Sequence, residues 1–110
     1  MAEEVVREIF WTDSAKKSFN KIIEYLDTNW TEREISRFVN ETVYLLSNLK
    51  SQPEIGRPSS KRKSVRICVV NRHTQLIYHY QPRKKQIVVL LFWGQKQDPG
   101  MTRWASGRSK

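Results

Sequence analysis

The sequence predicts one α+β domain in which a hairpin of two helices packs on a mostly antiparallel, twisted sheet. Three observations lead to this class. The chain of 110 residues fits a single core. Two consecutive segments carry apolar residues at helical spacing, and three short strand-like runs follow them. The predicted order is therefore strand, helix, helix, strand, strand, strand. We assign residues 1–98 to the domain and 99–110 to a C-terminal tail whose end we expect to be disordered.

The first strand and the first helix meet at a short polar junction. Residues 5–11 are rich in β-branched and aromatic side chains, which favours a strand. Thr12 or Asp13 can cap the helix that follows. Its apolar residues recur at steps of three and four, which places them on one face: Ala15, Phe19, Ile22, Ile23, Leu26 and Trp30.

The second helix begins almost at once. Thr31 followed by Glu34 matches a capping box. The predicted buried stripe is Ile35, Phe38, Val39, Thr42, Leu46 and Leu49. Because the link between the helices is so short, we expect an antiparallel hairpin over about residues 13 to 50. The segment 51–58, with two prolines and Gly56, ends the helical part.

Three strands are predicted in the second half, at about 64–71, 75–81 and 86–93. The first places Val65, Ile67 and Val69 on one face. The second alternates, with one face made by Leu76, Tyr78 and Tyr80 and the other by Ile77 and His79. The third is apolar on both faces, which is typical of a strand in the middle of a sheet or against a partner.

Charge is divided unevenly along the chain. Residues 1–56 hold seven Lys/Arg and ten Asp/Glu, a net −3, whereas residues 57–110 hold thirteen and one, a net +12. This asymmetry indicates an anionic partner, either nucleic acid or an acidic protein segment. A solvated basic surface that only keeps the protein soluble is the alternative.

Composition also limits the kind of protein. Cys68 is the single cysteine and there are two histidines, so we expect no internal disulfide, no metal and no cofactor. The start of the chain lacks the order of a secretory signal, and no apolar run is long enough to span a membrane. We therefore expect a cytoplasmic protein without a membrane partner.

Several short motifs, in order, resemble the RelE/ParE superfamily of bacterial type II toxins, from about residue 5 to residue 99. They are FWTDSA at the first helix, NW before the second, LKSQPEIGRP after it, VR in the next strand, LIYHY in the following one, and a terminal QDP. The resemblance implies the helical hairpin on a sheet described above. It also implies a toxin, with a role in plasmid stabilisation and growth inhibition, that a cognate acidic antitoxin binds in a hetero-oligomeric complex.

The superfamily carries two activities on one fold. RelE-like members cut messenger RNA at the ribosome, and ParE-like members bind and poison DNA gyrase. The resemblance to the RNA-cutting members implies basic residues on the second strand, an arginine opening the third, an arginine after the fourth, and often a C-terminal tyrosine or histidine. Here Cys68 and Gln75 stand at two of the cation positions, and no Tyr or His occurs in the tail. The resemblance therefore favours the ParE-like branch, with RNA cleavage as the alternative.

Few residues remain for a ribonuclease site. If the chain cuts RNA, Arg66, His79 and Lys96 must share the chemistry. His79 is more typical of a packed or edge histidine, and His73 of a solvated turn residue. Arg66 either pairs with a carboxylate, such as Asp98 or one from the helices, or contacts an anion. Asp98, before Pro99, is suited to starting a turn.

Contacts with the antitoxin or with the target are expected at the basic residues of the second half. The residues are Arg66, Arg72, Arg83, Lys84 and Lys85, of which the last three should lie at the rim of the antitoxin interface. An amphipathic antitoxin segment fits both the charge and the doubly apolar last strand.

Overall fold

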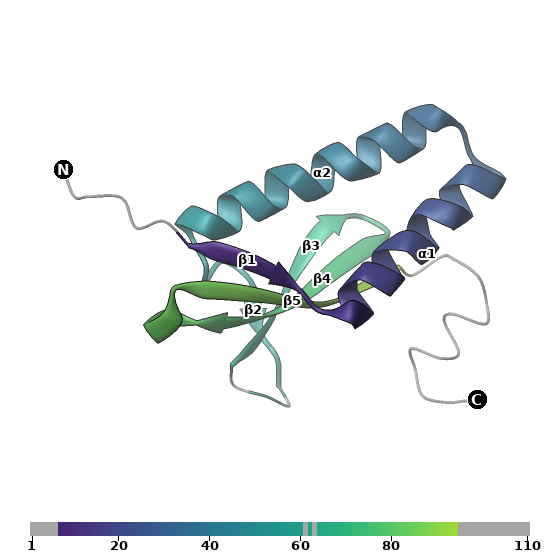
Figure 1. Ribbon diagram of the computed structural model, residues 1–110. Helices are drawn as coiled ribbons and strands as arrows, with labels where there is room; N and C mark the ends of the chain where they lie inside the picture. The colour runs from purple at the N-terminus through teal and green to yellow at the C-terminus, as the bar shows by residue number, and fades with distance from the viewer. Residues whose placement is uncertain (1–6, 61, 63, 95–110) are drawn as a thin grey trace.

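The computed structural model describes residues 7–60, 62 and 64–94 and places two helices on one face of a sheet (Figure 1). The helices are α1 (Asp13–Asn29) and α2 (Glu32–Ser51). The strands are β1 (Glu8–Trp11), β2 (Arg57–Pro58), β3 (Val65–Asn71), β4 (Thr74–Gln81) and β5 (Gln86–Gly94), with a 3-10 turn, η1 (Pro82–Lys84), between β4 and β5. The predicted α+β class and element order are confirmed. The predicted boundary between domain and tail lies outside the described residues.

The sheet has five strands in the order β1-β5-β4-β3-β2. β1 runs parallel to β5, and the other neighbours are antiparallel. β5 therefore lies inside the sheet, between β1 and β4, as its apolar sequence predicted. β2 was not predicted, because two residues that include Pro58 carry no alternating pattern. It pairs with Ile67 and Arg66 at the edge of the sheet, where a missing N–H is tolerated.

The start of α1 is tied to β5, a strand inside the sheet. Thr12, rather than Asp13, is the cap, and its Oγ1 accepts a hydrogen bond of 3.0 Å from the backbone N–H of Ala15. The same hydroxyl lies 3.0 Å from the carbonyl oxygen of Val89, to which it donates. The backbone N–H of Thr12 donates to that carbonyl as well. One residue thus fixes both the first turn of α1 and its position on β5.

The two helices form the predicted antiparallel hairpin, with differences at the turn. Thr31 precedes α2, but its hydroxyl donates to the Glu34 carboxylate, 2.6 Å away, and caps no backbone N–H. Trp30 was predicted to be buried and is 55% exposed. The reason is that α1 ends at Asn29 and the backbone of Trp30 is extended, which takes its side chain off the helical stripe.

The core lies between the helices and the covered face of the sheet. Its aromatic centre packs Trp11, Phe19, Phe38 and Phe92 with ring centroids 5.1 to 6.5 Å apart. Ser18 links α1 to β5, because its Oγ accepts a bond of 2.9 Å from the N–H of Phe92. Most of the predicted helix stripes are buried here or packed against the core.

A β-bulge sets which side chains of β5 face the helices. Ile77 pairs with Leu91 and Tyr78 pairs with Val89, so Leu90 is an extra residue without an opposite partner. The buried residues Ile87, Val89 and Phe92 consequently share the covered face although their spacing is not strictly two.

On β3 the two faces have different surroundings. The predicted trio Val65, Ile67 and Val69 lies on the face away from the helices, where Val69 is 62% exposed. Arg66 and Cys68 lie on the helix side, opposite Tyr78 and Leu76. Within the described part of the chain, neither helix combines the length and the hydropathy that crossing a bilayer requires.

Candidate functional site

Arg66 holds the loop that leaves α2. Its Nη1 donates to the carbonyl oxygens of Gly56, at 2.6 Å, and of Glu54, at 3.1 Å. The sequence predicted that Arg66 pairs with a carboxylate or contacts an anion. In the structure its partners are instead two backbone carbonyls. Because the guanidinium satisfies the part-buried carbonyl of Gly56 and the exposed carbonyl of Glu54, its contacts within the chain are structural.

Tyr78 completes the same attachment. Its hydroxyl donates to the carbonyl of Pro53, at 2.6 Å, and accepts from the N–H of Gly56, at 3.1 Å. Burial raises the pKa of Tyr78 to about 12 and also raises the pKa of the neighbouring Cys68 thiol. A Cβ on Gly56 would lie 2.8 Å from the Tyr78 hydroxyl, so only glycine allows this approach. These groups form a closed polar network under the loop.

His79 lies on the other face of the sheet. It pairs with Val65 and Val88, is half-exposed, and its Nδ1 lies 3.1 Å from the carbonyl oxygen of Ser64. Arg66 is opposite Tyr78, the next residue along β4, so Arg66 and His79 point to opposite faces. The structure therefore does not bring this predicted catalytic pair together. Lys96 and Asp98 lie outside the described residues.

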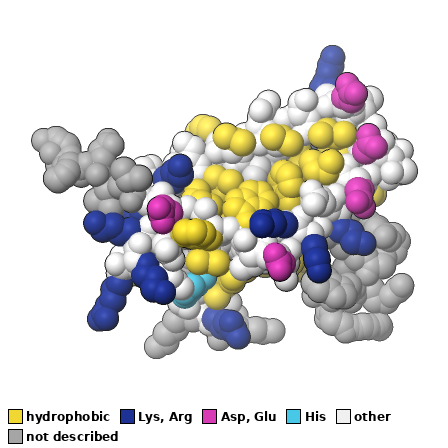
Figure 2. Space-filling model, viewed as in Figure 1, with side chains coloured by type: hydrophobic (Ala, Val, Ile, Leu, Met, Phe, Trp, Pro, Cys, Tyr) yellow, Lys and Arg dark blue, Asp and Glu magenta, His cyan; other side chains and the backbone are white. Residues whose placement is uncertain are grey.

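The predicted contact residues occupy three places. Arg83, Lys84 and Lys85 are exposed in and after η1, and we call this turn the basic turn. Lys85 has a φ of 54°, and its carbonyl accepts from the N–H of Glu8. Arg72 is exposed at the other end of β4, and Arg66 is under the α2–β3 loop. Figure 2 shows several Lys and Arg side chains toward the left of the view and others along the rest of this face.

Apolar surface is exposed on two elements beside this charge. Val43 and Tyr44 on α2 are 59% and 70% exposed, and Phe10 on β1 is 47% exposed. Figure 2 shows hydrophobic side chains over α2 and beside β1. Apolar area of this kind is typical of a surface that a partner covers.

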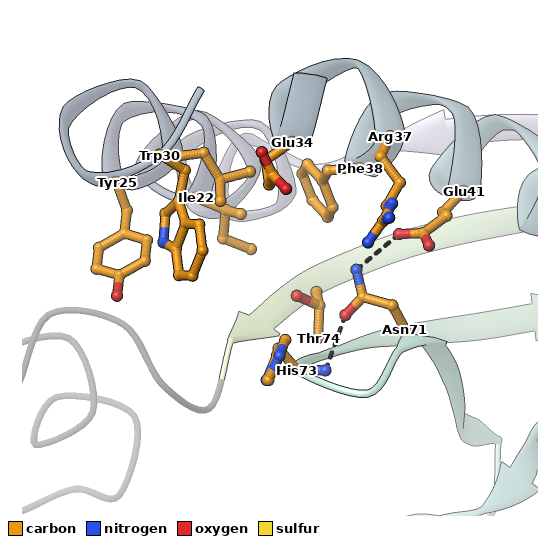
Figure 3. A pocket seen from close by; sticks show the side chains of 11 residues that line it. Ile22, Tyr25, Trp30, Glu34, Arg37, Phe38, Glu41, Asn71, His73 and Thr74 are labelled. Atoms are coloured by element: carbon orange, nitrogen blue, oxygen red, sulfur yellow. Dashed lines mark hydrogen bonds between the residues drawn. The ribbon is translucent and has the colours of Figure 1, made fainter. Parts of the chain in front are cut away.

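A groove that sequence reasoning missed lies near the turn that joins the two helices (Figure 3). It has a volume of about 550 Å³, and we call it the hairpin groove. Its lining comes from α1, α2 and the β3–β4 turn: Ile22, Tyr25, Leu26, Trp30, Glu34, Arg37, Phe38, Glu41, Asn71, His73 and Thr74. The available signal was Trp30, a large apolar residue directly after the end of a helix.

This fold, two helices on a five-stranded and mostly antiparallel sheet, is that of the RelE/ParE superfamily of toxin–antitoxin toxins. The family model described as the ParE toxin of the type II toxin–antitoxin system parDE matches residues 9–99, and the chain belongs to that family. A search of curated proteins finds no match.

Solved structures share the fold at low sequence identity. A chromosomal ParDE toxin–antitoxin system from P. aeruginosa superposes with a TM-score of 0.67 at 18% identity, covering 83% of this chain and 98% of the other. The RelBE2 toxin–antitoxin complex from Mycobacterium tuberculosis gives 0.58 at 16% identity, covering 80% and 96%. A YoeB/ParE toxin from Agrobacterium tumefaciens gives 0.58 at 17% identity, covering 77% and 94%.

Proposed function

We propose that this ParE-type toxin acts by binding a protein target, DNA gyrase, and that a cognate antitoxin neutralises it. The family match covers residues 9–99, and two similar structures are toxin–antitoxin assemblies. Binding rather than RNA cleavage is the mode of action that the arrangement of the polar residues supports.

The observation that carries this choice is the separation of Arg66 from His79. Cleavage through a ribose hydroxyl needs a base and cations within reach of one phosphate. Here Arg66 is bound to the carbonyls of Glu54 and Gly56, and His79 faces the opposite side of the sheet. Losing one preorganised charge typically costs about 10² to 10³ in rate. Gln75 and Cys68 supply no positive charge, so the described residues contain little of what RNA cleavage requires.

The antitoxin segment that fits this surface is acidic and amphipathic. The second half of the chain carries a net +12, and exposed apolar side chains lie on α2 and β1. Charge accelerates the encounter, whereas buried apolar contacts slow dissociation. Co-purification with the product of the neighbouring reading frame tests this part: the toxin eluting alone from a co-expressing strain would contradict it.

The target is tested by two assays, one on gyrase with purified toxin and one on the transcripts of induced cells. We expect loss of gyrase supercoiling activity in the presence of the purified toxin, and transcripts without new ends phased to codons. Codon-phased cuts with unaffected supercoiling would replace this proposal by the RelE-like ribonuclease.

A variant separates the two mechanisms further. His79→Gln combined with Lys96→Ala should leave growth arrest and gyrase inhibition intact in a target-binding toxin, but should abolish cleavage in an enzyme. Arg66→Ala is a poor substitute, because Arg66 holds the α2–β3 loop and its loss would affect folding. Circular dichroism and thermal unfolding of the double variant provide the control for folding.

A further inference from the structure

We propose that the hairpin groove is the docking site of the chain's own C-terminal segment, residues 95–110, with Trp104 as the side chain that enters it. This inference concerns contacts within one chain and holds whichever target the toxin has. Four features support it: the open groove, the point from which the segment starts, its apolar residues and its charge.

The groove presents apolar surface that the described residues leave uncovered. Ile22 and Tyr25 of α1 and Trp30, directly after that helix, lie along one wall, and Phe38 of α2 lies beside Ile22 (Figure 3). Trp30 is 55% exposed although it is among the largest side chains of the hairpin. The volume of about 550 Å³ is within the range of cavities that hold large ligands, and it accommodates an aromatic side chain.

The C-terminal segment starts beside the groove. Gly94, the last residue of β5, is paired with Thr74, and Thr74 lines the groove together with His73. Trp104 follows ten residues later, a reach of up to about 33 Å for an extended chain. The helical part of this wall, from Ile22 to Asn29 at the end of α1, is about 11 Å long at the rise of an α-helix. The segment therefore reaches every part of the groove without a change in the fold.

The segment carries the side chains that such a groove accepts. Met101 and Trp104 are its two large apolar residues. An indole stacked against Trp30 or Tyr25 would remove apolar area of both partners from water, and aromatic pairs are favourable beyond that area. Because the segment is covalently attached, its effective concentration at the groove is high, and modest contacts suffice.

The charges are complementary as well. The segment has four cations, Lys96, Arg103, Arg108 and Lys110, and one acid, Asp98. The groove has two carboxylates, Glu34 and Glu41, against one guanidinium, Arg37. A hydrogen bond from the Thr31 hydroxyl lowers the pKa of Glu34, so this carboxylate keeps its charge under mildly acidic conditions. Figure 2 shows acidic side chains toward the end of the molecule where α1 meets α2.

Limited proteolysis of the full chain tests the docking. Trypsin cleavage after Arg103 releases residues 104–110, which mass spectrometry quantifies against a synthetic peptide of residues 95–110. We expect cleavage in the full chain to be at least about tenfold slower than in the peptide, a protection of about 1.4 kcal/mol. Trp30→Ala should return the rate close to that of the peptide.

Tyr44→Ala is the matched control. Tyr44 is another exposed aromatic residue of the hairpin, 70% exposed, and it does not line the groove. Its replacement should leave the protection unchanged. Equal rates for the parent chain and the peptide, or equal effects of Trp30→Ala and Tyr44→Ala, would overturn the proposal. Protection that rises with protein concentration would assign the groove to the segment of a second copy, and would overturn it too.

A second measurement does not depend on proteolysis. In heteronuclear NMR spectra, Trp104→Ala should shift the indole N–H of Trp30 and the methyl signals of Ile22, whereas Ser109→Ala should not. If Trp104→Ala leaves both groove signals in place, the segment does not dock there.

Discussion

At the scale of single residues, Tyr78 shows how a polar group becomes part of the core. Its side chain is completely buried, yet its hydroxyl has both a donor and an acceptor in the α2–β3 loop. Arg66 holds the same loop from the neighbouring strand. A buried hydroxyl with both partners satisfied is nearly neutral, whereas loss of the hydroxyl leaves Gly56 N–H and Pro53 C=O unpaired.

Tyr78→Phe should therefore destabilise the fold by about 1 to 3 kcal/mol in urea unfolding, without a change of fold. Tyr80→Phe is the control, because no hydrogen bond of the Tyr80 hydroxyl contributes to holding this loop. A cost below about 0.5 kcal/mol for Tyr78→Phe would mean that the network contributes little to stability.

The same tyrosine makes stability depend on alkaline pH. Its pKa is about 12 in the folded chain against 10.0 for an ordinary tyrosine. The unfolded chain thus releases this proton first, so the contribution of Tyr78 is complete below pH 10 and is lost as pH rises toward 12. The loss has a limiting slope of about 1.4 kcal/mol per pH unit. We expect the difference in unfolding free energy between the parent and Tyr78→Phe to shrink over this window; a constant difference would contradict the shifted pKa.

At the scale of secondary-structure elements, the two helices have caps of different kinds. The Thr12 hydroxyl accepts a hydrogen bond from the N–H of Ala15 and donates one to the carbonyl of Val89, so this side chain links a helix end to β5. Thr31 contacts only the exposed Glu34 carboxylate. The same amino acid before two consecutive helices therefore makes different contributions to stability.

Thr12→Ala should cost about 1 to 2 kcal/mol in unfolding free energy, because it removes the cap and the contact with β5. Thr31→Ala should cost less than about 0.5 kcal/mol, since it loses an exposed side-chain contact. Parallel thermal or urea unfolding of the two variants measures the difference. Equal losses of unfolding free energy in the two variants would show that the contact of Thr12 with β5 does not stabilise the fold.

At the scale of the whole molecule, the basic turn and the hairpin groove carry opposite charge and lie in different places. The basic turn is at one end, whereas the hairpin groove with Glu34 and Glu41 lies where the helices and the β3–β4 turn meet. An acidic antitoxin segment would be attracted to the first region and repelled by the second. Charge variants in two different places should therefore have unequal effects on binding.

Arg83→Glu combined with Lys84→Glu should slow association with the antitoxin about tenfold at low salt and leave dissociation nearly unchanged. Lys85 is kept, because it ends the turn in a left-handed conformation and its carbonyl oxygen accepts a hydrogen bond from the N–H of Glu8 on β1. Lys16→Glu with Lys17→Glu, an equal change of charge on the exposed face of α1, is the control and should have a smaller effect. Stopped-flow or surface-based kinetics at two ionic strengths measures both rates. A changed dissociation rate with unchanged association would contradict steering by the basic turn.

Local patterns were sufficient for much of the fold. Helical spacing identified α1 and α2, and the short link predicted their antiparallel hairpin. The doubly apolar run predicted that β5 lies inside the sheet rather than at its edge. The alternation on β4 separated Tyr78 from His79 correctly. These features depend on residues close in sequence, whose periodicity is a direct consequence of helix and strand geometry.

The candidate site was harder to predict. Its lining residues come from both helices and from the β3–β4 turn, whose first lining residue, Asn71, is 20 positions after Ser51 at the end of α2 (71 − 51). Trp30 was expected in the core because it continues the spacing of α1, and it is exposed because the helix ends one residue earlier. The sequence predicted that Arg66 lies on β3, but it did not predict its carbonyl partners. These carbonyls belong to a loop, in which the residues follow no helical or strand periodicity.

By itself, the sequence determined the class, the order of the elements, the uneven charge and the resemblance to the ParE-like toxins, because each follows from composition or from neighbouring residues. The tertiary structure alone decided the parallel pairing of β1 with β5, the bulge at Leu90 and the opposite orientation of Arg66 and His79. It also decided the hairpin groove. These features arise from contacts between distant segments, and such contacts are set by how the whole chain packs rather than by any local pattern.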